Sequence, residues 1–293
     1  MTKERLLLPI HRRPGALANI ALAVCGISTT FTPGNGAPKI QIVWDDMEVN
    51  SAHLKDFGKI CGLSPPTEVL YPLYPLTLAF PLIMRILGHK KAPLSVFRTL
   101  NTKLQVVSHR EIGVHEKLRL ICETGALRIV AKGLEMDISS TVQAGNEIVW
   151  ESLHTFYYRG QFGKPDVSGV DHEKLSAISR CNMWASWYLS GGIGLRFAGI
   201  SGDTNGLHYS NWYARMLGFD KAFAQPILVL TKTLHCLPGP VAPNFGLQAL
   251  FRGPIYYSSY VNLKGISDDT GVRFDIFCRP NSRPSVCCHF EHL

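Results

Sequence analysis

Two long apolar runs organise the chain, and segments with a strand-like pattern follow each of them. Leu76–Leu87 is strongly apolar and long enough for a buried helix, which Gly88 would end. Pro226–Leu237 is the second such run, and its proline suits the first turn of a helix. Extended segments are predicted after the first run at 95–108, 117–123, 134–143 and 147–158, and after the second at 245–251, 255–266, 272–278 and 285–292.

A buried helix followed by antiparallel strands predicts an α+β layer in which the sheet wraps the helix. This order of elements occurs twice, although we find no clear repeat in the residues themselves. The Gly- and Pro-containing stretches 34–38 and 160–174 are natural breaks. We therefore predict a leader at 1–38, a first unit at 39–160, a linker at 161–180 and a second unit at 181–293.

Two segments of the first third have more local predictions. A short strand is expected at Ile40–Trp44, and Ser51–Cys61 is typical of a helix with Ser51 as its N-cap and Gly62 as its stop. Near the N-terminus, basic residues precede the apolar segment 15–31, the charge layout of a signal peptide. We favour a helix that packs on the domain, with peripheral membrane contact left open. No run of about eighteen apolar residues occurs, so a spanning helix is not predicted.

The first part of the second unit carries the candidate chemistry. Residues 201–206, Ser-Gly-Asp-Thr-Asn-Gly, are loop formers, and His208 follows them. A helix-like segment then runs to Leu217, with Gly218 at its end. Asp203 and His208 are an acid and an imidazole five residues apart, which is a plausible acid/base pair. Taken alone, Asp203 could instead cap a turn, and His208 could be a hydrogen-bonded core histidine.

This segment resembles the hydratase motif of the MaoC-like dehydratases and the (R)-specific enoyl-CoA hydratases. Residues 71–73 and 78–82 also resemble the approach to the first central helix in fused members of that family. The likeness covers roughly residues 40–293 and implies a double hot-dog fold, two helix-wrapped-by-sheet units in one chain. The motif positions are Phe197, Ser201, Gly202, Asp203, Asn205, His208, Ala214, Gly218 and Phe219.

The resemblance implies a hydro-lyase that interconverts a (3R)-hydroxyacyl thioester and a trans-2-enoyl thioester. Asp203 and His208 would act as the catalytic residues on the water that is added or removed. Asn205, Gly202 and Ser201 would orient their loop. The first unit lacks this motif, so one active site per chain is expected, with the first unit as scaffold and acyl pocket.

The sequence departs from the family at the second central helix. Relatives usually read Ala-His-Gly-Met there, and the backbone N–H of the Gly helps to hold the thioester oxygen. Here Pro226 stands at the Gly position, and proline has no N–H. Gln225 and Ile227 are the residues that could supply an oxyanion or substrate contact instead. Gly206 also stands where many relatives have Pro.

Three functions stay open at this point. The first is an active hydratase or dehydratase. The second is an isomerase or dehydratase of a specialised, polyketide-like biosynthetic intermediate. The third is a non-catalytic protein that binds acyl thioesters. Pro226 favours the last two, and the intact Asp203/His208 loop favours the first two.

Composition and charge limit the kinds of molecule that the protein is expected to bind. With 46% hydrophobic and 18% charged residues the chain is globular, and its net charge of +8 suits a phosphate-bearing partner. Coenzyme A or an acyl carrier protein would be the substrate's carrier, and no redox cofactor is expected. The basic residues are scattered, which disfavours nucleic acid as a partner.

Metal-site motifs are missing, and the eight cysteines are interpreted as reduced thiols of a cytoplasmic protein. The acyl chain, the direction of reaction, fatty acid or polyketide metabolism, and homodimer formation stay open.

Overall fold

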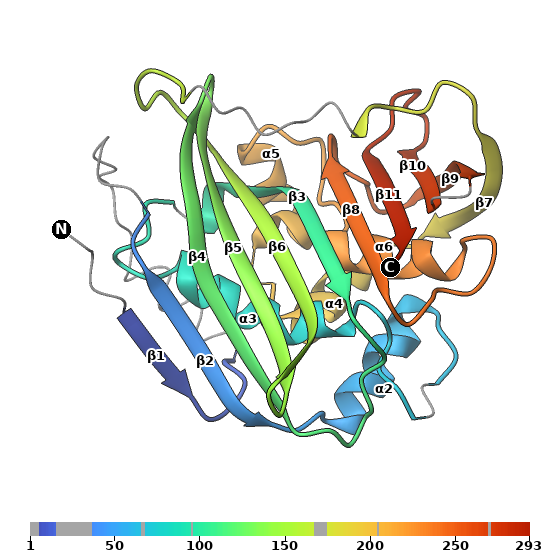
Figure 1. Cartoon of the computed structure of the whole chain (residues 1–293). Helices are drawn as coiled ribbons and strands as arrows, with labels where there is room; N and C mark the ends of the chain where they lie inside the picture. Colours follow the sequence, from blue (N-terminus) through green and yellow to red (C-terminus); the bar gives the residue numbers. More distant parts are fainter. Residues whose placement is uncertain are drawn as a thin grey trace.

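One continuous sheet forms the frame of the molecule (Figure 1). The computed structural model describes residues 6–15, 37–65, 68–94, 96–166, 175–203, 205–268 and 271–293. Within these residues, eleven strands pair in the order β1-β2-β4-β5-β6-β3-β8-β11-β10-β9-β7. Their bounds are β1 Leu6–Ile10, β2 Ile40–Met47, β3 Thr99–Ser108, β4 Leu118–Val130, β5 Gly133–Ala144, β6 Glu147–Arg159, β7 Asn182–Leu189, β8 Phe245–Phe251, β9 Ser259–Asp268, β10 Gly271–Cys278 and β11 Val286–His292.

The sheet contains the same five-strand order twice. If the strands of each unit are numbered along the chain, both units read first, third, fourth, fifth, second across the sheet. The first unit has this order as β2-β4-β5-β6-β3, and the second has it as β7-β9-β10-β11-β8. The two copies meet where β3 pairs antiparallel with β8, so that Val106 lies opposite Leu247. The repeat predicted from the order of elements is therefore present in the strand topology.

Each unit contributes one central helix to the core. Helix α3 spans Tyr74–Leu87 and buries every residue except Arg85, while α6 spans Pro226–His235. Figure 1 shows α3 behind β4, β5 and β6, and α6 beside β8 and β11. Buried side chains of both helices belong to one apolar cluster that runs through both units. The apolar character of the two runs follows from this burial, because nearly every helix face is covered.

Several local predictions need correction. The N-cap of α2 (Ser51–Cys61) is Asn50 and not Ser51, since Asn50 Oδ1 accepts from the His53 N–H at 3.0 Å. Gly62 ends that helix in the left-handed region as predicted. The helix α3 starts at Tyr74, two residues before the predicted start at Leu76, because Pro75 fits a first helical turn. The helix predicted at 15–31 lies outside the described residues beyond Gly15.

Two edge strands were missed by the sequence analysis. Strand β1 lies in the predicted leader and pairs parallel with β2. Strand β7 starts the second unit and pairs with β9. An edge strand of the sheet buries less of its length than a central one, so β7 shows mostly exposed and half-buried residues and no clear alternation.

The site lies in the segment that joins β7 to α6. It contains α4 (Ile193–Ser201), the short 3₁₀ turn η3 (Gly206–His208) and α5 (Asn211–Met216). A second 3₁₀ turn, η1 (Val96–Arg98), precedes β3. Among the helices of the described residues, none has the length and apolar character that crossing a bilayer requires.

Candidate active site

The candidate site begins where α4 ends at Gly202. Gly202 adopts φ +73°, and its N–H donates to the Ala198 carbonyl at 2.9 Å, which closes the helix. A Cβ at this position would lie 2.5 Å from Cγ of Pro81 on α3. Gly202 is thus required twice, for its backbone conformation and for the close approach of the loop to the central helix of the first unit.

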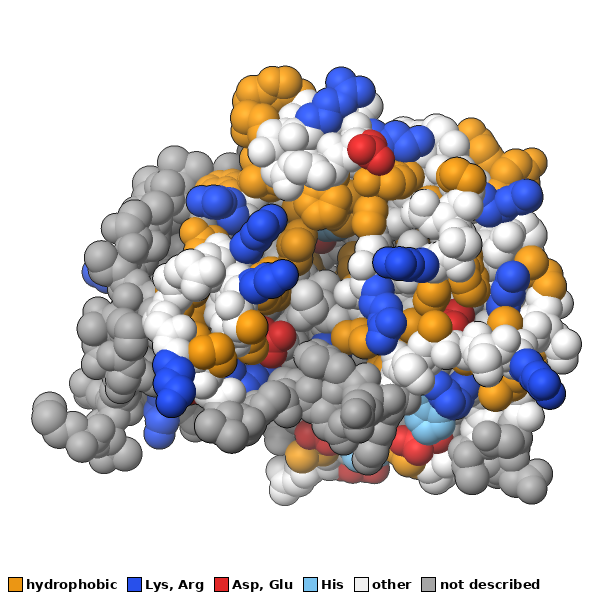
Figure 2. Space-filling view, turned by 90° about the horizontal axis from the view of Figure 1, so that it is seen from above, with side chains coloured by type: hydrophobic (Ala, Val, Ile, Leu, Met, Phe, Trp, Pro, Cys, Tyr) orange, Lys and Arg blue, Asp and Glu red, His pale blue; other side chains and the backbone are white. Residues whose placement is uncertain are grey.

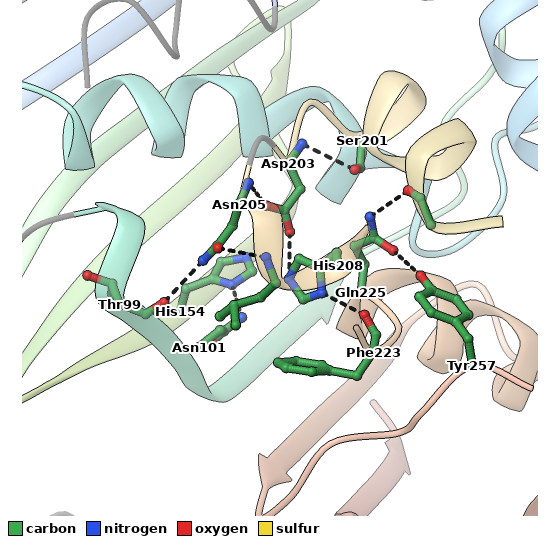
Figure 3. Close-up of polar contacts among 12 residues, drawn as sticks. Thr99, Asn101, His154, Ser201, Asp203, Asn205, His208, Phe223, Gln225 and Tyr257 are labelled. Carbon is green, nitrogen blue, oxygen red and sulfur yellow. Dashed lines mark hydrogen bonds and ion pairs between the residues drawn. The ribbon is translucent and has the colours of Figure 1, made fainter. Parts of the chain in front are cut away.

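Side chains of the loop hold its backbone in place (Figure 3). The Ser201 hydroxyl accepts from the Asp203 N–H at 3.2 Å, and Asp203 Oδ1 accepts from the Asn205 N–H at 3.0 Å. Asn205 Oδ1 in turn accepts from the Leu207 N–H at 3.2 Å and caps η3. Its amide nitrogen donates to the Thr99 carbonyl of the first unit at 3.5 Å. The predicted loop-orienting residues therefore all take part in this turn, and the turn contacts both units.

The turn brings Asp203 and His208 together. Asp203 Oδ2 lies 3.2 Å from His208 Nε2, and both side chains are buried, with 4% and 7% of their residues exposed. On the other side of the ring, His208 Nδ1 lies 2.9 Å from the Phe223 carbonyl oxygen. A carbonyl only accepts, so Nδ1 carries a proton, and Nε2 is the nitrogen that faces the carboxylate.

This geometry fixes the proton count of the pair. If Asp203 were ionised and Nε2 bare, two acceptors would face each other at hydrogen-bond distance without a proton. One proton therefore lies between Oδ2 and Nε2, on one residue or the other. Burial raises the pKa of Asp203, and the nearby His208 and the Asn205 N–H act in the opposite direction. A carboxyl and an imidazole that share one proton can both give and take a proton.

The pair lies against a mainly apolar pocket that both units line. Phe80 and Leu104 come from the first unit, and Phe223 and Ile227 from the second. A neighbouring pocket of about 350 Å³ shares Asn101, Phe223 and Pro226 with it, and the exposed Arg252 is part of its lining. Figure 2 shows a hollow in one face of the molecule with Lys and Arg side chains around its rim.

The start of α6 completes the site. Gln225 is its N-cap position and Pro226 its first residue, both in the pocket lining with Ile227. The Gln225 amide is already engaged, because its nitrogen donates to the Gly194 carbonyl at 3.0 Å and its oxygen accepts from the Tyr257 hydroxyl at 2.8 Å. The Ile227 N–H belongs to the first helical turn, whose N–H groups have no partner within the helix. Of the two residues predicted as oxyanion contacts, the geometry favours Ile227.

Sequence reasoning missed the residues of the first unit that face the pair. Thr99 and Asn101 on β3 and His154 on β6 line the same pocket as Asp203. A signal for His154 was present, since it occupies an inward position of an alternating strand, between Ser152 and Phe156. An inward polar residue in such a pattern indicates either a satisfied hydrogen bond or a site.

The described residues hold no group of three or more His, Cys, Asp or Glu side chains that could bind a metal ion. The described cysteines are all free thiols. Burial raises the pKa of the Cys61 and Cys122 thiols to about 12, which keeps them protonated and unreactive.

Comparison with solved structures decides the fold. The crystal structure of HtdX from Mycobacterium tuberculosis superposes with a TM-score of 0.72 at 18% identity, covering 86% of this chain and all of that one. A conserved hypothetical protein of the same organism with a double hotdog fold gives 0.59 at 11% identity, over 92% of this chain and 97% of that one. The chain is a double hot-dog protein. The α+β double hot-dog predicted from the sequence is confirmed.

The double hot-dog chain is also related in sequence to a named enzyme. It is 22% identical over 266 residues to 3-hydroxyacyl-thioester dehydratase X of M. tuberculosis, over 88% of this chain and 91% of that protein. A MaoC-like dehydratase from Phytophthora capsici shares the fold with a TM-score of 0.69 at 17% identity, covering 88% of this chain and 95% of that one. No family model matches the chain. The resemblance to MaoC-like dehydratases that the motif indicates is confirmed by these relatives.

Proposed function

We propose that this double hot-dog protein is a hydro-lyase that interconverts a (3R)-hydroxyacyl thioester and a trans-2-enoyl thioester. The observation that carries the proposal is the buried Asp203/His208 pair, 3.2 Å apart, with the imidazole oriented by the Phe223 carbonyl. The sequence relative named a 3-hydroxyacyl-thioester dehydratase supports the same reaction class.

The proton count of the pair matches the reaction. Hydration requires one proton to be delivered to C2 of the enoyl group and one to be taken from the water that attacks C3. The pair starts with one shared proton. The residue that holds it gives it to C2, and the other takes the proton of the attacking water. The pair ends with one proton again, so the catalyst is regenerated without any other group. Dehydration is the reverse.

The thioester oxygen gains negative charge during this step and needs a fixed donor. We propose the Ile227 N–H for that role. It lies in the first turn of α6, where the helix dipole also favours negative charge, and its residue lines the pocket that contains Asp203 and His208. Pro226 cannot donate, but its fixed φ stabilises the helix start and so holds the Ile227 N–H in position.

The carrier of the acyl group would approach from the second pocket. That pocket shares Asn101, Phe223 and Pro226 with the pocket of the acid/base pair. Arg252 in its lining is suited to a phosphate. Coenzyme A and an acyl carrier protein both present the thioester on a phosphopantetheine arm, so either carrier fits this chemistry. No redox cofactor takes part in the proposed reaction.

One observation favours a second function. Proline at the usual donor position removes an N–H worth on the order of a hundredfold in rate. An enzyme that needs less charge stabilisation at the thioester oxygen, such as an isomerase or dehydratase of a specialised polyketide-like intermediate, would tolerate this loss. A protein that only binds acyl thioesters would tolerate it as well.

Turnover of a simple substrate separates these functions. The purified protein is given trans-2-octenoyl-CoA, and the loss of the enoyl absorbance is followed with wild type and with His208→Ala. We expect hydration by the wild type and its collapse in the variant. Formation of the (3R)-hydroxy product is checked by chiral chromatography. Tight binding of the thioester without any turnover would refute the hydratase proposal and support the binding protein.

A further inference from the structure

Two polar atoms in the pocket of the acid/base pair are buried and have no hydrogen-bond partner among the residues that the structure describes. They are Oδ1 of Asn101 and Nε2 of His154. His154 itself is fully buried, and its Nδ1 lies 2.9 Å from Nδ2 of Asn101, so the two side chains form a hydrogen-bonded dyad (Figure 3). Leaving a buried polar atom without a partner costs on the order of 1–3 kcal/mol, so two together call for an explanation.

The hydrogen bond within the dyad determines what the unpartnered atoms can do. If the Asn101 amide donates to Nδ1, then the proton of the neutral imidazole is on Nε2, and the dyad presents one donor, Nε2–H, and one acceptor, Oδ1. If the amide is turned round, its oxygen accepts from Nδ1–H, and the dyad presents an amide N–H and a bare Nε2. Either orientation therefore offers one donor and one acceptor.

The imidazole stays neutral because its surroundings are apolar. Burial lowers the pKa of His154 to about 3. The ring lies between two phenylalanines, with ring centroids 5.9 Å from Phe80 and 5.8 Å from Phe156. Met84 and Leu87 line the same pocket. Away from Thr99, Gln225 and the loop of the acid/base pair, the dyad is thus the polar point of a pocket whose other described walls suit a hydrocarbon chain.

A hydroxyl group is the chemical complement of this point, because it accepts one hydrogen bond and donates another. A carbonyl could only accept, and a methylene could do neither, so each would leave buried polar atoms unpaired. The thioester and C3 must lie at Asp203, His208 and the start of α6, all in the second unit. Asn101 and His154 belong to the first unit and line the same pocket together with Phe80, Met84 and Leu87 of that unit, so a chain that extends from the pair along these apolar residues would pass the dyad.

We propose that Asn101 and His154 form a subsite for a hydroxyl on the acyl chain, beyond C3, so that the substrates are acyl thioesters with a second oxygen function. This inference rests on the proposed function for the position of the thioester. A site built to hydrogen-bond a substrate hydroxyl discriminates against the analogue that lacks it, because its own polar groups are then left unpaired.

Binding and turnover of a matched series of thioesters test the subsite. The probes are octanoyl-CoA, trans-2-octenoyl-CoA and their monohydroxy derivatives with the hydroxyl at each carbon from C5 to C8. The saturated compounds are titrated calorimetrically, and the enoyl compounds are assayed for hydration. We expect one hydroxy isomer to bind about 10- to 100-fold more tightly than the unsubstituted chain, with a matching gain in kcat/KM.

Two variants identify the residues responsible. His154→Phe keeps a ring between the two phenylalanines, and Asn101→Leu keeps the side-chain size, but each removes a polar partner. Both should lose the preference and bind the unsubstituted chain at least as tightly as the wild type does. His109→Phe, at an exposed histidine, serves as the matched control and should keep it.

The outcomes separate this inference from the proposed function. Equal affinity of the wild type for all chains would overturn the subsite, and the dyad would then hold only a water molecule. A clear preference in calorimetry without turnover of any enoyl compound would support the subsite and refute the hydratase. Turnover of every enoyl compound at one rate would support the hydratase and overturn the subsite. A preference that both variants retain would also overturn the assignment.

Discussion

The sharpest test of the acid/base pair is the substitution Asp203→Asn. The two side chains have the same shape, so the variant can keep the turn, since the amide oxygen can still accept from the Asn205 N–H that now donates to Oδ1 at 3.0 Å. The amide nitrogen then faces His208 Nε2 and donates to it. The imidazole remains in place, but the shared proton is gone, and Asn can neither give nor take one.

The expected loss follows from the role of the missing proton. Removal of a positioned general acid or base typically costs 10²- to 10⁴-fold in rate, so we expect kcat to fall by about three orders of magnitude, or about 4 kcal/mol in activation free energy. Stability should not fall with it. Burial raises the pKa of Asp203, which means that its ionised form is disfavoured in the folded protein, and a neutral amide removes that cost.

The assay is hydration of trans-2-octenoyl-CoA with the thermal midpoint measured in parallel. Asp275→Asn is a matched control, because Asp275 is also buried, at 1% exposure, and accepts from a backbone N–H, that of Ile178, at 2.8 Å. It lies on β10 and outside the residues that line the pocket. Its rate should stay within about twofold of the wild type. A folded Asp203→Asn protein that keeps more than about a tenth of the wild-type rate would refute the reasoning.

Further predictions concern the loop, the dyad and the helix start. Gly202→Ala should lower the free energy of unfolding by about 1–3 kcal/mol more than Gly218→Ala in chemical denaturation; both glycines have positive φ, but only at Gly202 would the added methyl meet another helix. Equal losses of stability in the two variants would show that a methyl group at position 202 does not clash with Pro81. Burial lowers the pKa of His154 from 6.5 to about 3, so when the pH decreases the imidazole is protonated in the unfolded chain before it is protonated in the folded protein. The free energy of unfolding of the wild type therefore decreases as the pH is lowered below about 6.5. His154→Phe lacks this loss, so between about pH 7.5 and about pH 5 it should gain about 2 kcal/mol relative to wild type, and a constant difference would contradict the buried neutral ring. Pro226→Ala should change kcat less than about tenfold if the Ile227 N–H is the donor; a rise of a hundredfold would show that the helix start lacks one in the wild type.

The elements that the sequence predicted well are those whose residues carry a strong local signal. Both central helices are nearly all buried, so their apolar runs stand out, and the loop 201–206 with its Asx and glycine turns is dense in residues that favour one backbone. The edge strand β7 has no such signal, because much of it is exposed and its pairing is decided by β9, far along the chain. Because β7 was not predicted, the identical order of five strands in the two units could not be predicted either.

The set of residues that line the pocket could not be predicted from the sequence either. Asp203 and His208 are five residues apart, and a motif can show them. Asn101 and His154 are 53 residues apart, on strands that pair through a bulge after Asn101. They face the loop of Asp203 and His208 only because β3 and β8 join the two units. Long-range pairing of this kind depends on register, which single-sequence patterns do not specify.

The junction of β3 with β8 has a genetic consequence. In a symmetric dimer of separate hot-dog subunits, any substitution appears in both subunits at once, so a change in the wall of the acyl pocket also alters the equivalent strand beside the catalytic loop. Here each unit has its own codons. In the proposed function, the first can vary to suit new acyl chains while the second keeps the turn that positions Asp203 and His208. The two tasks can then evolve at different rates within one gene.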